Sequence, residues 1–273
     1  MSAGSGAFSA AAGAGPARPL PWQPGPPAGG CRVPDMRIAI MQPYFFPYPG
    51  YFQLIRAADA FIFLDDVAFI KKGWIHRNRL FFNDRVHLFS IPLADMSQHR
   101  AISATQVSAQ EFPRWREKFL ASLHAFYRKQ PYFHEGLALL EDVLAMPFRS
   151  IADLAIHSVQ RTCATLGMDI PERRSSQLGT GREAHREERL IDLCRHCGGD
   201  VYVNAPGGAE LYTRDMFAPH GIRLEFLEPC LAPYPVKGRA FVPGLSILDA
   251  LMCCGAAHVR ERLLSGYRLR EAV

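Results

Sequence analysis

Two adjacent carboxylates, Asp65 and Asp66, directly follow the short apolar run at 60–64. The carboxyl end of a buried strand is a position where α/β proteins often place ligand-binding groups. One carboxylate could act as a general base, or the pair could hold a divalent cation through oxygen ligands. Because neighbouring residues of a strand point to opposite faces, we expect only one of them, by preference Asp66, to serve a given site.

A cationic and aromatic segment, KKGWIHRNR at 71–79, follows this acidic pair. Arg presents a planar fork of N–H donors that suits phosphate or carboxylate, and Trp can stack on a base or sugar ring. The segment therefore predicts an anion and ring site, although a solvated basic loop is the alternative. His76 lies inside this motif and joins the acidic pair as a predicted catalytic residue. The predicted substrate-binding residues here are Lys71, Lys72, Trp74, Arg77 and Asn78.

The segment QPYFFPYPG at 42–50 precedes both motifs. Its three prolines stiffen a loop after a predicted strand, and Gly50 opens a predicted helix whose N–H groups could face an anion. Gln42 and Tyr44 are therefore predicted to bind substrate. The alternative is that the aromatic side chains only cover the core.

Near the carboxyl end, Ser246 and Asp249 stand three residues apart after a Pro-Gly-Leu turn. This spacing predicts a capping box, in which Ser246 caps a helix and Asp249 returns a hydrogen bond. The functional alternative is that both residues bind substrate, facing the acidic and basic motifs from the other half of the fold.

These motifs need elements that hold them, and the hydrophobic pattern predicts an α/β fold. A strand at 37–41, a helix at 50–59 and a strand at 60–64 form a βαβ unit, so the core sheet should be mainly parallel or mixed, with flanking helices. Three helical runs within 113–166 predict an inserted or appended helical group. The other predicted elements are a hairpin (77–82 and 86–91), helices at 182–198 and 246–254, and strands at 200–203 and 222–227.

Composition separates residues 1–35 from the remaining chain. The first part is rich in Ala, Gly, Pro and Ser, which predicts a disordered extension or a gene start placed too early, before Met36. Residues 36–273 are long enough for one large domain or two small ones, and we take them as one domain. No apolar run reaches transmembrane length, and seven cysteines without an export signal predict reduced thiols and a cytoplasmic protein. The net charge of +5 is too modest and too scattered to predict nucleic-acid binding.

The segment from Gln42 to Arg79 resembles the amino-terminal signature of the WbqC-like family. The resemblance continues through SSQL at 175–178, Tyr202, Tyr212 and FVPGLSILDALMCCG at 241–255. One departure is Val236, because the resemblance leads us to expect Gln two residues after Tyr234. The residues that carry the first motif are Gln42, Pro43, Pro47, Gly50, Tyr51, Phe52, Asp65, Asp66, Val67, Phe69, Lys71, Gly73, Trp74, Arg77 and Asn78.

The resemblance implies a role in bacterial surface polysaccharide, such as the O-antigen of lipopolysaccharide. We expect a transferase that acts on a nucleotide-activated sugar, with acyl or aminoacyl transfer to an amino sugar as the named reaction. The expected partners are the sugar precursor and an acyl or aminoacyl donor. No cofactor or dedicated metal site is predicted, apart from the divalent cation considered above. The alternative is a non-catalytic module that binds the glycan precursor or a partner enzyme.

Overall fold

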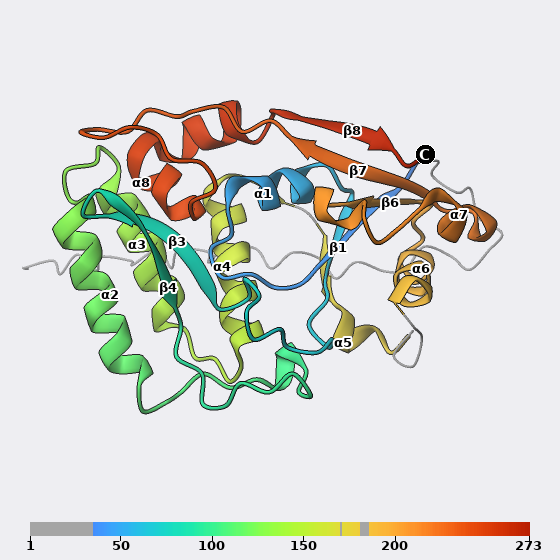
Figure 1. The fold of residues 1–273 in the computed structure, drawn as a ribbon, viewed down its shortest axis with the longest axis horizontal. Coiled ribbons are helices and arrows are strands. Elements are labelled where there is room, and N and C mark those ends of the chain that lie inside the picture. The colour runs from blue at the N-terminus through green and yellow to red at the C-terminus, as the bar shows by residue number, and fades with distance from the viewer. Residues whose placement is uncertain (1–34, 170, 181–185) are drawn as a thin grey trace, which may run out of the picture.

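The structure is a computed structural model that describes residues 35–169, 171–180 and 186–273. Apart from Asp35, the predicted amino-terminal extension lies outside the described residues. The predicted α/β class is confirmed, because a six-stranded sheet of order β5-β2-β1-β6-β7-β8 is surrounded by helices (Figure 1). All neighbouring pairs are parallel except β7 and β8, so the sheet is mixed.

The strands of this sheet match the predicted apolar runs closely, and β1 has the predicted bounds. The shortest strand, β5, and the antiparallel edge strand, β8, were not predicted. The strands are β1 (Arg37–Met41), β2 (Ala60–Phe63), β5 (Glu172–Arg174), β6 (Val201–Asn204), β7 (Arg223–Pro229) and β8 (Tyr267–Glu271).

Side chains alternate between the two faces of the sheet, as the pleat of a strand requires. Phe61 and Phe63 of β2 point into one core, while Ile62 points into the other. The first core packs against α1, α3, α4 and α8, and the second packs against α6 and α7. Both faces are covered, which explains why the central strands read as continuous apolar runs.

The helices begin where the sequence supplies starting signals. Pro49 stands in the first turn of α1, and a complete capping box of Ser150 and Asp153 opens α4. The predicted helix at 182–198 is described from Arg186 onward. The helices are α1 (Pro49–Arg56), α2 (Phe112–Tyr127), α3 (Phe133–Ala145), α4 (Ile151–Thr165), α5 (Ser175–Leu178), α6 (Arg186–His196), α7 (Arg214–Phe217) and α8 (Ile247–His258).

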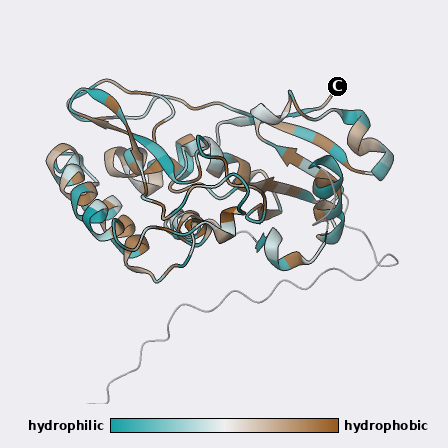
Figure 2. Ribbon diagram, turned by 60° about the horizontal axis from the view of Figure 1, so that its bottom comes forward, coloured by the Kyte–Doolittle hydropathy of each residue, from teal (hydrophilic) through white to brown (hydrophobic). Residues whose placement is uncertain are grey.

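The predicted hairpin and helical group are both present between β2 and β5. Strands β3 (Arg77–Phe82) and β4 (Arg85–Ser90) form a separate two-stranded sheet (Figure 1), which packs on α2 through Phe82 against Phe126 and Phe89 against Phe119. Asn83 and Asp84 turn the hairpin at φ 47° and 58°, as a type I′ turn requires. Helix α2 mixes hydrophobic and hydrophilic residues along its length, and Phe119, Leu123 and Tyr127 form its buried stripe (Figure 2).

Short segments connect these elements. They are the 3₁₀ turns at Ile102–Ala104, Pro206–Gly208 and Ala218–His220 and the π-helical turn at Val259–Leu263. An irregular connecting segment, residues 230–246, runs from β7 to α8. Within the described ranges, no helix is both long and apolar enough to cross a membrane.

Candidate functional site

A cavity of about 290 Å³ opens at the carboxyl ends of the parallel strands β1 and β6. Gln42 directly follows β1, and Ala205 and Pro206 directly follow β6. Part of the cavity wall is apolar and is formed by Leu227 of β7, Ile70 and Ile75. In open α/β sheets this end of the strands is the usual place for ligands.

Aromatic side chains dominate the wall of this cavity, which is lined by Tyr44, Tyr48, Tyr51 and Trp74. The rings of Tyr44 and Trp74 lie 6.2 Å apart at an interplanar angle of 32°, and Trp74 remains 43% exposed. Tyr44 also meets Tyr51 edge to face at 6.2 Å. Three predicted binding residues, Gln42, Tyr44 and Trp74, are thus brought to one cavity.

The loop that carries Tyr44, residues 42–48 (the aromatic loop), is fixed at Phe46. Phe46 has a φ of 42°, a left-handed conformation that is costly for a bulky residue and needs support from its surroundings. Its N–H donates to Ser158 Oγ at 2.9 Å, and its carbonyl accepts from Ser246 Oγ at 2.7 Å. The Asn78 amide also donates to this carbonyl. Residues far apart in the chain therefore hold the aromatic loop in place.

Asn78 is fully buried and links the aromatic loop to the hairpin. Its Nδ2 donates to the Phe45 carbonyl at 3.2 Å, while its Oδ1 accepts from Tyr44 Oη at 3.2 Å and from the Arg79 N–H at 2.7 Å. Burial raises the pKa of Tyr44, and the charges of Arg79 and Arg77 oppose this shift. The phenol is therefore neutral at physiological pH and is positioned by Asn78.

The cationic residues of the 71–79 motif occupy different environments. Arg77 donates from Nε to the Gly73 carbonyl at 2.9 Å and from Nη2 to the Lys72 carbonyl, so it closes the turn that carries Trp74. Lys71 and Lys72 are exposed on that turn and do not line the cavity.

His76 is buried, and its ring lies 5.3 Å from that of Phe69. Burial, assisted by the nearby charge of Arg77, lowers the pKa of His76 to about 4. The imidazole is consequently neutral near pH 7. It does not line the cavity, and its Nδ1 has no hydrogen-bond partner in the described part of the chain.

The acidic pair binds the start of α5 and lies outside the cavity wall. Asp65 is fully buried and accepts from Ser176 N at 3.0 Å and Ser176 Oγ at 2.8 Å. Asp66 forms an ion pair with Arg189 of α6 at 2.5 Å. Ser175 Oγ is within hydrogen-bonding distance of both carboxylates, at 3.2 Å and 2.5 Å.

The two carboxylates therefore meet at Ser175 and do not point to opposite faces of the sheet. Strand β2 ends at Phe63, so the alternation of a regular strand no longer applies at Asp65 and Asp66. Among the described residues, no group of three or more His, Cys, Asp or Glu side chains is arranged to hold a metal ion.

For the second predicted pair, Ser246 and Asp249, the structure confirms the helix cap by Ser246 but not the capping box with Asp249. Ser246 caps α8, accepting from the Leu248 N–H at 3.3 Å, but its own N–H donates to the Arg79 carbonyl. The predicted capping box is wrong. In a capping box Asp249 would accept a hydrogen bond from the Ser246 N–H, but this N–H donates to the Arg79 carbonyl.

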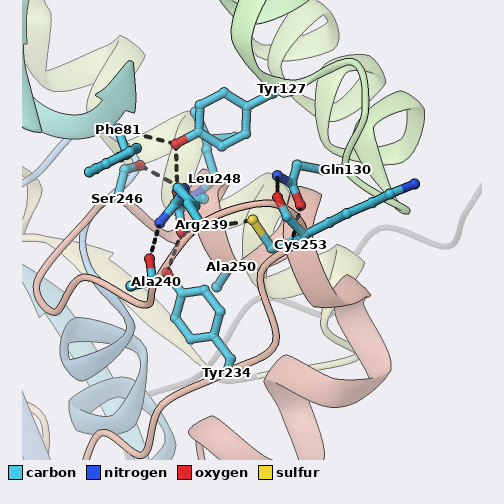
Figure 3. Close-up of polar contacts among 12 residues, drawn as sticks. Phe81, Tyr127, Gln130, Tyr234, Arg239, Ala240, Ser246, Leu248, Ala250 and Cys253 are labelled. Atoms are coloured by element: carbon cyan, nitrogen blue, oxygen red, sulfur yellow. Dashed lines mark hydrogen bonds and ion pairs between the residues drawn. The ribbon is translucent and has the colours of Figure 1, made fainter. Parts of the chain in front are cut away.

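Asp249 instead lies at the centre of a buried polar cluster. Its carboxylate is fully buried and accepts from Tyr127 Oη and Tyr234 Oη, each at 2.5 Å, and from Arg239. Figure 3 shows Tyr127 of α2 on one side of Arg239 and Tyr234 of the connecting segment on the other. Arg239 also stacks on Phe81 at 4.5 Å. The cluster ties the connecting segment to α2, α8 and the hairpin.

Several residues that contact the cavity wall, the acidic pair or Asp249 were not predicted from the sequence. Arg79 stands within the RNR motif, but no feature of the sequence distinguishes it from Arg77. Ser175 and Ser176 belong to the SSQL segment, which resembled the family without suggesting a partner. Tyr127 and Arg239 lie in a helix and an irregular segment that carry no motif, so no local signal marks them.

Comparison with known proteins agrees with this arrangement of motifs. Residues 42–261, well over half of the chain, match the model of the WbqC-like protein family. The chain is also 26% identical over 223 residues to the uncharacterized protein Rv1507c of Mycobacterium tuberculosis, a match that covers 81% of this chain and 94% of that protein. No solved structure matches the chain. The aromatic loop, the 71–79 motif and the start of α8 all fall within the matched residues, and the chain belongs to the WbqC-like protein family.

Proposed function

We propose that this protein works on a precursor of bacterial surface polysaccharide, of the O-antigen type, and binds a ring of that precursor in the aromatic cavity. The observation that carries the proposal is the pairing of Tyr44 and Trp74 at the carboxyl ends of parallel strands. A flat aromatic wall with a few polar groups suits the apolar face of a sugar or base. The amide of Gln42, which has no partner within the described ranges, is available to orient the ring.

We further propose that the protein is a cytoplasmic transferase for a nucleotide-activated amino sugar. In acyl or aminoacyl transfer, the sugar amine attacks the carbonyl of the donor. A new C–N bond forms, the bond from the carbonyl to the donor's leaving group breaks, and the amine loses a proton. Of the two carboxylates, Asp66 is the better candidate for that proton, because its side chain keeps 16% exposure whereas Asp65 is fully buried.

A second candidate function is a non-catalytic module that binds the glycan precursor. The observation that favours it is the placement of the predicted catalytic groups. Asp65 and Asp66 are occupied by serine and arginine partners, and His76 is buried away from the cavity wall.

Thermal unfolding with UDP-N-acetylglucosamine tests the ring site. A ligand that binds only the folded protein at about 100 times its Kd adds roughly 2.7 kcal/mol, which corresponds to a rise of roughly 5 °C in Tm for a chain of this size. We expect Trp74→Ala to abolish the rise. Phe126→Ala, which removes an exposed aromatic ring from α2, is the matched control and should retain it. Retention of the full rise in Trp74→Ala would contradict the proposal.

Turnover separates the two candidate functions. The protein is incubated with a UDP-amino sugar and an acyl-coenzyme A donor, and the acylated sugar is measured by mass spectrometry. The transferase predicts product that is lost in Asp66→Asn, with ring binding retained. If the protein binds the ring but forms no product over long incubation, the result favours the binding module. Full activity in both Asp65→Asn and Asp66→Asn would show that the acidic pair takes no part in the reaction.

A further inference from the structure

We infer that Arg79 is the residue that binds the phosphate of the ligand, beside the ring held by Tyr44 and Trp74. The inference rests on the proposed function and adds the chemical class of the ligand, a ring that carries a phosphate ester. A glycosyl phosphate and a nucleotide share this chemistry. The assignment differs from the prediction from sequence, which placed Lys71, Lys72 and Arg77, but not Arg79, among the substrate-binding residues.

Arg77 uses two of its hydrogen-bond donors within its own turn. Its Nε and Nη2 donate to the carbonyls of Gly73 and Lys72, which shapes the segment on which Trp74 stands. Its guanidinium lies 5.8 Å from the centre of the Trp74 ring. Arg77 is thus a positioning residue for Trp74.

Arg79 is also close to Trp74 but keeps a donor unused. Its guanidinium lies 5.2 Å from the centre of the Trp74 ring, and its Nη2 donates to the Gly244 carbonyl at 2.9 Å. Its Nε is buried and has no hydrogen-bond partner among residues 35–169, 171–180 and 186–273. A buried cationic N–H without a partner is unfavourable, and a phosphate oxygen is the type of acceptor that forms its strongest hydrogen bonds.

The backbone holds the Arg79 guanidinium in position. Gly244 has a φ of 69°, and a Cβ at this residue would lie 2.7 Å from Arg79 Nη2. The positive φ favours glycine in this turn, and the missing side chain leaves room for Arg79 Nη2 beside it. A fixed guanidinium loses less entropy on binding an anion than a freely rotating one does.

Arg79 does not itself line the cavity, but its guanidinium lies 5.2 Å from the centre of the Trp74 ring, which does. Among nearby charges, that of Arg79 has the largest effect in opposing the raised pKa of Tyr44, whose ring forms part of the wall. No acidic side chain pairs with Arg79 in the described part of the chain, so its charge is available to a ligand. The aromatic wall and this cation together fit a ring whose phosphate lies over Trp74.

Isothermal titration calorimetry at ~50 mM salt, where charge interactions are weakly screened, tests the inference with two matched pairs of probes. N-acetylglucosamine is compared with its 1-phosphate, and uridine with uridine 5′-monophosphate. We expect the phosphate form of at least one pair to bind at least tenfold more tightly than the neutral form. The pair that shows the larger ratio identifies whether a glycosyl phosphate or a nucleotide occupies the site.

The variants then assign the phosphate contact. Arg79→Gln should reduce the ratio between phosphate and neutral forms to below about three, whereas the matched Arg77→Gln should weaken both forms together and keep the ratio. Arg79→Lys retains the charge and loses the fork, so it gives an intermediate ratio and serves as the test if Arg79→Gln does not fold.

The possible failures are distinguishable. Neutral rings that bind in a Trp74-dependent way, with no preference for phosphate, leave the proposed function standing and overturn the inference. A preference that persists in Arg79→Gln, or that is lost in Arg77→Gln alone, also overturns it. If none of the four probes binds, the ring site itself is contradicted and the inference falls with it.

Discussion

At the scale of single residues, the carboxamide of Asn78 connects more of the site than any charge does. It supplies donors to the Phe45 and Phe46 carbonyls and an acceptor to Tyr44 and Arg79. An amide is the side chain that can donate and accept at the same position, and Asn78 uses both capacities while fully buried. The aromatic loop therefore depends on the chemistry of this amide rather than on its volume.

Asn78→Asp tests this dependence with almost no change in size. The introduced carboxylate would face two carbonyl oxygens, so we expect the free energy of unfolding to fall by about 3 kcal/mol at pH 7. Protonation restores a donor, and the loss should shrink as the pH falls towards 4. Urea denaturation measures both effects. Tyr44→Phe, the control, removes one hydrogen bond and should cost less than about 1.5 kcal/mol; an equal loss in both variants would contradict the role of Asn78.

His76 predicts a pH dependence of stability. Its pKa is lowered to about 4 in the folded protein, mainly by burial, whereas an unfolded histidine titrates near pH 6.5. Between these values the unfolded chain binds more protons, so this contribution to stability is complete above about pH 6.5 and is lost as the pH falls towards 4. We expect His76→Gln to remove a pH-dependent contribution on the order of 1–3 kcal/mol over this window.

Urea denaturation of the parent and His76→Gln at intervals between pH 4 and 7 measures this contribution as the difference between the two proteins. Burial also lowers the pKa of His157, but that contribution is common to both proteins and cancels. A difference that does not change with pH would show that His76 has the same pKa in the folded and unfolded states, as an exposed histidine would.

At the scale of elements, the Asp249 cluster explains how an irregular connecting segment becomes part of the fold. Tyr234 and Arg239 of the segment bind one carboxylate of α8. The Gln130 side chain accepts from the Lys237 N–H at 3.1 Å and donates to its carbonyl at 2.9 Å. Residues 230–246 thus obtain from tertiary contacts the order that helices and strands obtain from their own hydrogen bonds.

Asp249→Asn should release this segment. The amide oxygen can still accept from a tyrosine, but Arg239, whose side chain is only 11% exposed, loses its counter-charge, so we expect a loss of about 3 kcal/mol. Trypsin should then cleave after Lys237 faster than in the parent, with the fragments identified by mass spectrometry. Tyr234→Phe removes one hydrogen bond from the same cluster and should cost about 1 kcal/mol. Unchanged cleavage in Asp249→Asn would show that other contacts hold the segment.

At the scale of the whole molecule, the two hydrophobic cores share the central strands β1, β2, β6 and β7. Each of these strands contributes alternate residues to both cores, so unfolding of one core would also displace the strand residues that form the other. The described residues should therefore unfold as one cooperative unit.

Leu140→Ala in α3 and Leu193→Ala in α6 test this cooperativity from opposite faces of the sheet. Both leucines are fully buried, so each substitution should cost about 3 kcal/mol. Circular dichroism and tryptophan fluorescence should report the same single transition in both variants. A second transition that appears in only one variant would show that the two faces unfold separately.

The sequence by itself determined those elements whose signals are local. Strand β1 and the hairpin turn at Asn83 and Asp84 follow from apolar periodicity and from residues that tolerate positive φ. Strands β5 and β8 were missed because their sequences, ERR and YRLRE, are too charged to read as buried strands. They lie at the two edges of the sheet, where the neighbouring strand supplies the hydrogen bonds and polar side chains remain at the surface.

For the candidate site, the sequence identified the aromatic loop, Trp74 and the basic motif, because unusual residues are concentrated there. Only the tertiary structure decided which polar atoms are occupied. Arg77 and Arg79 are equivalent by residue type, yet Arg77 binds carbonyls in its own turn and Arg79 meets Gly244, 165 residues away. Asp249 likewise binds Tyr127 across 122 residues of chain rather than its local cap. The partner of a buried polar group depends on which distant backbone and side-chain atoms the fold brings within about 3 Å, and no local pattern specifies that distance.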